Sequence, residues 1–265
     1  MAPIQYIVDA NCCEPHGLRC CWVVPDGVRH VTFEVWGGGG GGGSGGKQCN
    51  CCDTGEPGLG GAYARKSINV TPGDYYWVCA GNGGMWDEFT TSGRPLGNGC
   101  CNGINGGASY VIGVGLTNFC AEGGRGGRSD LGIGCYYWCG CNGYSSGTPG
   151  ISATSYGYDY HAHSNNYTMG FTQEQSPYHH FKHAGNGAGP YGGGGGWNHS
   201  GGAYCTFTTY VGHNPWFPNT SQVESLWHGR IPGGGGAPYH SSHQCNCYNG
   251  GKSGTGAPGA VKITY

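Results

Sequence analysis

Histidines with metal-ligand spacing are the first candidates for chemistry in this chain of 265 residues. One residue separates His161 from His163, and on a β-strand this spacing turns both imidazoles to the same face. Three such pairs around the axis of a trimer would supply six nitrogens, an octahedral set suited to iron or a similar divalent ion. The other interpretation is that these histidines stack on tyrosines or face solvent in loops. Further candidates are His179, His180 and His183.

Cysteine is the second group with chemistry, because the chain has 17 of them in tight clusters. An odd number cannot pair completely within one chain, so at least one thiol is free or pairs with another molecule. Two clusters, at 49–52 and 135–141, are dense enough for zinc, although their spacings differ from the usual CxxC. We favour disulfides that staple glycine-rich loops. The disulfide candidates are Cys12, Cys13, Cys20, Cys21, Cys49, Cys51, Cys52, Cys100, Cys101, Cys135, Cys139, Cys141, Cys245 and Cys247.

Aromatic clusters are the third group, and they suit binding rather than catalysis. Aromatic rings with nearby amides and hydroxyls can stack on sugar faces and make polar contacts with sugar hydroxyls. The alternative is that these rings pack only against glycine backbone. The candidate receptor-binding residues are Tyr136, Tyr137, Trp138, Tyr156, Tyr158 and Tyr160.

Several function classes are not expected. The acidic residues form no recognisable catalytic motif, so we predict that the chain is not an enzyme. Its 12 basic residues are scattered and the net charge is −2, which argues against nucleic-acid binding. No apolar run approaches the roughly 20 residues of a membrane span, so no membrane insertion is expected. The N-terminus resembles no Sec-type signal, so we expect the protein to be made in a cytoplasm and not exported by that route.

The elements that must position these residues are β-strands. No long segment carries a helical pattern free of Gly or Pro, so almost no helix is expected. Residues 31–36 alternate with period two, and 62–70 and 75–80 are predicted to be strands joined by a turn at 71–74. Further strands are predicted at 108–114 and at the C-terminus, where Val261, Ile263 and Tyr265 alternate. We expect the C-terminal strand to pair with an early strand.

Glycine accounts for 60 residues, often in runs such as 37–46. Such runs can be flexible linkers. They can also be extended three-fold polyglycine helices, packed side by side and hydrogen-bonded to their neighbours. The 19 Tyr, 8 Trp and 7 Phe favour order, because their large rings can offset the entropy that glycine loses on folding.

The predicted fold is therefore all-β, an antiparallel β-sandwich frame with long loops rich in glycine and aromatic residues and with packed polyglycine. Residues 22–115 and 256–265 would form the frame. Residues 1–21 would be a cysteine-containing N-terminal attachment segment. Residues 116–255 would be a long excursion rich in glycine, aromatic residues and histidine, the part in which function is expected because scaffolds present functional loops.

Three motifs resemble a known family. They are VPDGVRHVTFEVWGGGGGGG at 24–43, GGAYARKSINVTPGDYY at 60–76 and GAPGAVKITY at the C-terminus. This combination resembles the glycine-rich β domain of tailed-phage tail-fibre and virion structural proteins. The resemblance implies that the strands 62–70 and 75–80 form a hairpin. In style the chain is also similar to the tail-fibre tip adhesins of T-even-type phages, whose glycine-rich stretches alternate with variable recognition loops.

The resemblance implies a virion component, assembled in the host cytoplasm, of a phage that we expect to be marine or cyanobacterial. Its expected partners are other virion proteins, further copies in a homotrimer, and a host cell-surface glycan. Iron or zinc would be its cofactor if the histidine or cysteine clusters bind metal. The main expectation is an adhesin module of a tail fibre or tail tip. The alternative is a purely structural capsid decoration, head fibre or connector.

Overall fold

The fold was analysed in a computed structural model. It describes residues 5–9, 18–43, 47–48, 51–52, 57–85, 103–127, 153–162, 168–171, 180–183, 187–190, 192, 197–200, 229, 231–236 and 254–265. The strands are β1 (Gln5–Asp9), β2 (Leu18–Val23), β3 (His30–Trp36), β4 (Lys47–Gln48), β5 (Cys51–Cys52), β6 (Tyr63–Asn69), β7 (Tyr75–Ala80), β8 (Ser109–Gly113), β9 (Phe119–Ala121), β10 (Ser155–Tyr156), β11 (Tyr160–Ala162), β12 (Thr168–Phe171), β13 (His180–His183), β14 (Trp197–Ser200) and β15 (Ala260–Thr264).

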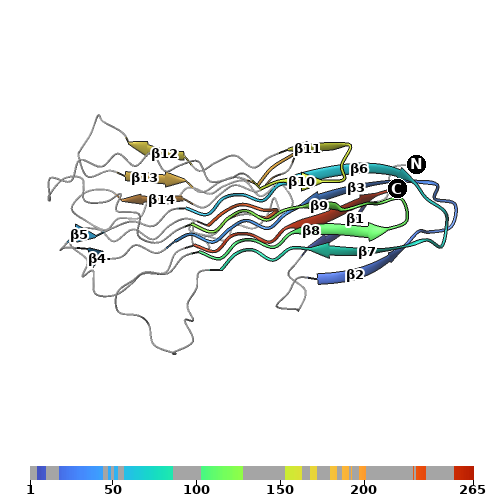
Figure 1. Ribbon diagram of the computed structural model, residues 1–265, viewed down its shortest axis with the longest axis horizontal. Helices are drawn as coiled ribbons and strands as arrows, with labels where there is room; N and C mark the ends of the chain where they lie inside the picture. The colour runs from blue at the N-terminus through green and yellow to red at the C-terminus, as the bar shows by residue number, and fades with distance from the viewer. Residues whose placement is uncertain are drawn as a thin grey trace, which may run out of the picture.

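Two five-stranded antiparallel sheets form a β-sandwich (Figure 1). Sheet A has the order β1-β15-β3-β6-β11, and sheet B has the order β10-β9-β8-β7-β2. A smaller sheet, β12-β13-β14, and the hairpin β4-β5 complete the described strands. These residues include no helix, and hence none that could cross a membrane. The predicted all-β sandwich is confirmed.

The strands read from the period-two patterns are present with close boundaries. β6 and β7 flank the predicted turn, where Gly73 has a φ of 89°. The predicted hairpin is wrong, because β6 lies in sheet A and β7 in sheet B, so the turn connects the two sheets. The C-terminal strand β15 pairs with β3, the early strand, and also with β1. The segment 116–255 also contributes to both sheets, because β9 and β10 lie in sheet B and β11 lies at the edge of sheet A.

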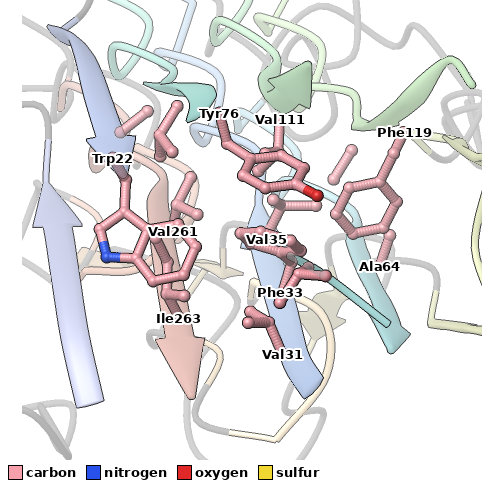
Figure 2. Packing of buried hydrophobic residues seen from close by; sticks show 14 of the residues in the cluster. Trp22, Val31, Phe33, Val35, Ala64, Tyr76, Val111, Phe119, Val261 and Ile263 are labelled. Atoms are coloured by element: carbon pink, nitrogen blue, oxygen red, sulfur yellow. The ribbon is translucent and has the colours of Figure 1, made fainter. Parts of the chain in front are cut away.

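The sandwich core follows directly from the alternation along the strands. Val31, Phe33 and Val35 of β3 point inward and are fully buried. The ring of Phe33 lies 5.1 Å from that of Tyr76 and 6.0 Å from that of Trp22, both from sheet B, as measured between centroids. Figure 2 shows these side chains, with Val261 and Ile263 of β15, meeting in one layer between the sheets. Large rings thus fill a core with few aliphatic side chains.

Beyond the sandwich, the strands continue as glycine-rich segments that lie side by side (Figure 1). We call this region the glycine bundle and define it as residues 37–42, 57–62, 81–85, 103–107, 122–127, 229, 231–236 and 254–259. Six of its segments extend β3, β6, β7, β8, β9 and β15 directly. Three run away from the sandwich and three return to it, so the bundle continues the axis of the strands.

Backbone hydrogen bonds hold the bundle together with a period of three residues. The N–H groups of Gly37 and Gly40 donate to the segment 59–62, those of Gly38 and Gly41 to 104–107, and those of Gly39 and Gly42 to 254–257. The N···O distances are 2.8–3.0 Å. A chain that turns to a new neighbour at every residue and returns after three has the three-fold repeat of an extended polyglycine helix. The predicted side-by-side polyglycine helices are confirmed in the described residues.

The segment 37–42 is the centre of this packing. Its six N–H groups donate to three segments, all of which return towards the sandwich and are antiparallel to it. Its carbonyls accept from three other segments, through the N–H groups of Gly84, Gly124 and Gly236. Six neighbours therefore surround one helix. The bond from Gly38 to the Gly107 carbonyl joins the continuation of sheet A to that of sheet B, so the two layers of the sandwich merge into one hydrogen-bonded body.

Such close contact requires that most positions in the bundle have no side chain. A Cβ added to Gly37, Gly40 or Gly58 would come within 3.0 Å of the backbone of a neighbouring segment, a separation that real Cβ atoms do not reach. The obstacle in each case is a backbone carbonyl, which cannot move without breaking its own hydrogen bonds. Ile104 lies where the bundle faces solvent, whereas Leu59 is a buried side chain within it.

Replacing a glycine inside the bundle with alanine is expected to destabilise the protein. In Gly40→Ala the new methyl group meets the Arg125 carbonyl, and forcing the segments apart is expected to lower the unfolding free energy by about 3 kcal/mol. This exceeds the gain of up to about 1 kcal/mol that alanine brings by restricting the unfolded chain. Urea unfolding of the two proteins measures the difference.

Ile104→Ala is the matched control, because it changes a bundle residue whose side chain is 49% exposed and keeps the backbone contacts. We expect it to shift stability by no more than about 0.5 kcal/mol. Equal stability of Gly40→Ala and Ile104→Ala would show that the bundle is not close-packed.

Candidate functional site

Two of the predicted receptor-binding tyrosines lie where the chain crosses from sheet B to sheet A. Tyr156 ends β10, and Tyr160 begins β11, the edge strand beside β6. Gly157 turns the chain between them with a φ of 65°, and a Cβ there would meet the carbonyls of Thr117 and Asn118. A glycine is therefore required at this crossing, and it fixes the direction of the residues that follow.

Tyr160 lies on the outer face of sheet A in a small stack. Its ring meets the buried ring of Tyr63 nearly edge-on at 6.0 Å, and the Arg65 guanidinium lies 5.4 Å from its centroid. Arg65 is the direct cross-strand partner of Tyr160. A cation over a ring face is attractive and limits ring motion. Tyr160 is nevertheless 48% exposed, so part of the held ring faces solvent.

Tyr158 and Asp159 complete this corner. The Tyr158 ring packs on the imidazole of His161 with 4.0 Å between centroids. The Asp159 carboxylate accepts a hydrogen bond from the Ser67 N–H at 2.9 Å and lies 3.8 Å from the Lys66 ammonium. These contacts position Tyr158 and Tyr160 on either side of a fixed carboxylate. We call Arg65, Lys66, Tyr158, Asp159, Tyr160 and His161 the corner site.

Beneath the corner site lies a buried polar cluster. The Tyr63 hydroxyl donates to Glu34 Oε1 at 2.6 Å, and the Lys262 ammonium lies 3.2 Å from Glu34 Oε2. Burial and the nearby Glu34 carboxylate raise the pKa of Tyr63 well above its ordinary value of 10.0. Ala188 and Gly189 cover this face, and Gly189 lies so close to the Tyr63 ring that no Cβ would fit there. The cluster thus lies on the outer face of sheet A and holds the Tyr63 ring against which Tyr160 packs.

Tyr156 differs from the other two tyrosines, because it belongs to sheet B. Its hydroxyl donates to Glu122 Oε1 at 3.1 Å. The second carboxylate oxygen of Glu122 accepts from the hydroxyl of Thr154 at 2.6 Å and from its N–H at 3.1 Å. These hydrogen bonds, that of the Thr154 hydroxyl above all, lower the pKa of Glu122. Glu122 is thereby committed to holding β10 in place.

At the far end of the glycine bundle, several described segments of the chain end beside one another. Hydrogen bonds join Gly42 to Gly254, Gly58 to Gly236 and Gly103 to Gly127 at this end. The segments 44–56, 86–102 and 237–253 therefore begin and end there, and 128–152 begins there. In the sequence these four segments hold the cysteine clusters at 49–52, 100–101, 135–141 and 245–247, and 128–152 also holds the predicted Tyr136, Tyr137 and Trp138.

The metal prediction is not resolved by the described residues. His161 packs against Tyr158, and His180 and His183 are the end residues of β13, of which the backbone is described. His163 and His179 lie outside the described residues. Within the described part of the chain, no three His, Cys, Asp or Glu residues group as metal ligands would. Iron or zinc binding stays a prediction.

The disulfide prediction likewise stays a prediction. Among the described cysteines, Cys21, Cys79 and Cys120 have free thiols. Burial and the nearby Glu122 raise the pKa of the Cys120 thiol, which favours its protonated form. Cys20, Cys51 and Cys52 lie on described strands, and the other candidates lie outside the described residues.

Sequence reasoning missed Arg65, Asp159 and Glu122 as residues that hold the predicted tyrosines. Strand alternation places Arg65 on the outer face of β6, so that signal was available. The pairing of β11 with β6 joins residues about 95 positions apart, and nothing in the local sequence indicates it. The corner site offers ring faces, a cation and an anion, which suits binding of a polar ligand through stacking and hydrogen bonds.

Tyr63 is expected to make the protein sensitive to alkaline pH. Because its folded-state pKa is raised, its stabilising contribution is complete below pH 10 and is lost as the pH rises further, when the unfolded chain ionises and the folded one cannot. The loss is up to about 1.4 kcal/mol per pH unit. We expect Tyr63→Phe to show a shallower decline in urea-unfolding free energy between pH 10 and 11.5.

Below pH 9 the unfolding free energies of wild type and Tyr63→Phe should differ by a constant amount. We expect this difference to be about 1.5–3 kcal/mol, for the lost hydrogen bond to the Glu34 carboxylate. Burial also raises the pKa of Tyr76, so part of the decline remains in the variant. Identical slopes above pH 10 in wild type and Tyr63→Phe would contradict the assignment.

The comparison with protein families covers nearly the whole chain. A family model described as a glycine-rich domain matches residues 18–265, which include both sheets of the sandwich from β2 onward and the whole glycine bundle. No curated protein matches the chain. The chain therefore belongs to the glycine-rich domain family.

Proposed function

We propose that this protein is a structural module of a phage particle, in which a rigid body presents loops that bind a host surface glycan. The observation that carries the proposal is that the bundle residues from which four chain segments continue are hydrogen-bonded to one another at its far end. The bundle fixes both ends of 44–56, 86–102 and 237–253 by backbone hydrogen bonds. Binding loops on a rigid scaffold lose less entropy on binding than free ones do.

The composition of the presented segments fits a glycan. Tyr136, Tyr137 and Trp138 give one of them three consecutive rings, and aromatic rings with nearby polar groups suit sugar recognition. The resemblance of the three sequence motifs to tail-fibre and virion proteins supports the phage assignment. A tip adhesin needs a body that withstands force along its axis, and at about 3.1 Å per residue the six residues of 37–42 extend the sandwich by roughly 19 Å.

The corner site is a second glycan contact of the same proposal. Tyr158 and Tyr160 are both partly exposed and held in place by His161 and Arg65. The Asp159 carboxylate and the Arg65 guanidinium lie beside them as polar partners for sugar hydroxyls. The preorganised rings would bind without ordering new side chains.

Binding of the full-length protein to host envelope polysaccharide tests the proposal. We expect Trp138→Ala and Tyr158→Ala each to weaken binding about tenfold, which corresponds to the loss of one stacked ring. Tyr158→Phe keeps the ring and should retain most of the affinity. His30→Ala, on the exposed end of β3, is a control remote in sequence from both contacts.

Isothermal titration or surface-bound polysaccharide gives the affinities. Failure of the correctly folded wild-type protein to bind any envelope polysaccharide would sink the adhesin proposal and favour the alternative, a purely structural decoration or connector. Loss of binding in Trp138→Ala with unchanged binding in Tyr158→Ala would restrict the site to the far end of the bundle.

A further inference from the structure

Part of the outer face of sheet B is apolar and exposed, whereas Cys79 on the same side of β7 is buried. Strand alternation sends Trp22, Tyr76, Val78 and Val111 into the core, and it sends the residues between them outward. Five of these outward residues are large and exposed, namely Val23 (53%), Tyr75 (60%), Trp77 (48%), Ile112 (57%) and Val114 (69%).

The strand register shows that these side chains form one continuous surface. Val23 is paired with Tyr75, and Trp77 is paired with Cys21 on one side and Ile112 on the other. The surface continues through Tyr110 and Cys120 to the half-exposed Tyr156 at the other edge of the sheet. We call this surface the sheet B face and define it by Cys21, Val23, Tyr75, Trp77, Tyr110, Ile112, Val114, Cys120 and Tyr156.

The size of the sheet B face approaches that of an interface. With aromatic side chains of about 200 Å², the five large exposed residues present on the order of 450 Å² of apolar surface, which is within the range of the largest patch on a typical monomer, often a functional one. A stable complex buries about 800 Å² on each partner. The half-exposed residues of the face and the sheet backbone between them supply the rest.

The chemistry of the face indicates what covers it. None of the side chains that define the face is charged. Two charged residues border it, because Asp74 precedes β7 and Glu122 follows β9, and Arg19 has a register position on the same side of β2, opposite Cys79. Two identical neutral faces can meet without like-charge repulsion. A partner recognised through its charge would instead require residues of the opposite charge on this face. Val23, Ile112 and Val114 offer only apolar contacts, which a second apolar face can match.

We propose that the sheet B face is the surface through which copies of this chain associate with one another. Flat sheets pack face to face at about 10 Å with interdigitated side chains, and an exposed sheet with Trp77 at its centre fits this mode. The interface lies on the sandwich, so the far end of the glycine bundle remains free in the assembly. The proposed association does not depend on which ligand the loops bind.

Sedimentation of the full-length protein over a range of concentrations tests the inference. We expect the wild type to form a homo-oligomer at micromolar concentration. Trp77→Lys places an unpaired charge at the centre of the interface and should raise the dissociation constant about 100-fold or more. Asn69→Lys is the matched control, because it adds the same charge at an exposed position of β6 in sheet A and should leave the oligomer intact.

Hydroxyl-radical footprinting of Tyr75 and Trp77 supplies an independent readout. Both residues should be protected in the oligomer and become reactive on dilution to the monomer or in a folded Trp77→Lys variant, whose fold is checked by its circular dichroism. Ile112→Glu is a second variant, should Trp77→Lys fail to fold.

Three outcomes would overturn the proposal. One is a wild-type protein that stays monomeric at about 100 µM, a concentration at which even a weak interface would form. Another is protection of Tyr75 and Trp77 in the monomer, because a segment of the same chain would then cover the face. The third is an oligomer that persists in both charged variants. If the wild type is monomeric and Trp77→Lys also loses polysaccharide binding, the sheet B face would be a glycan-binding surface instead.

Discussion

Direct contact between backbones is the interaction on which this structure depends. In an ordinary sandwich, side chains keep two sheets about 10 Å apart, and hydrogen bonds run only within each sheet. In the glycine bundle no side chains intervene, so the N–H groups of 37–42 reach three different segments in turn. The sheets are thus fused into a single hydrogen-bonded body. The entropy lost by so many glycines is offset by the completeness of this bonding rather than by an apolar core.

The two halves of the molecule therefore solve the packing problem in different ways. The sandwich uses rings, with Trp22, Phe33 and Tyr76 in mutual contact at its centre. The bundle is held together by hydrogen bonds between backbone amides. Where the halves meet, Trp36 and Tyr63 pack at 5.0 Å over the outer face of sheet A, and Glu34 anchors the Tyr63 hydroxyl. This junction also supports the corner site, so the positions of Tyr160 and Arg65 depend on the same buried cluster.

The sequence was sufficient for the framework and for the nature of the glycine runs. Period-two alternation identified β3, β6, β7, β8 and β15, because long strands with one buried face leave a clear pattern. Rings flanking the runs, such as Trp36, distinguished packed polyglycine from a linker. The short strands β9, β10 and β11 were not predicted, since two or three residues carry no periodicity. The corner site was visible only as its tyrosines. Arg65 and Asp159 join it through a pairing between distant segments that local patterns do not encode.

Burying peptide groups in place of hydrocarbon has a thermodynamic consequence. Unfolding the sandwich exposes apolar surface and raises the heat capacity, whereas unfolding the bundle exposes amides, which lower it. The two contributions oppose each other, so the heat-capacity change per residue is smaller than for a globular domain with an oily core. A smaller heat-capacity change flattens the dependence of stability on temperature. The bundle thereby extends the range of temperatures, cold ones included, over which the protein keeps its shape.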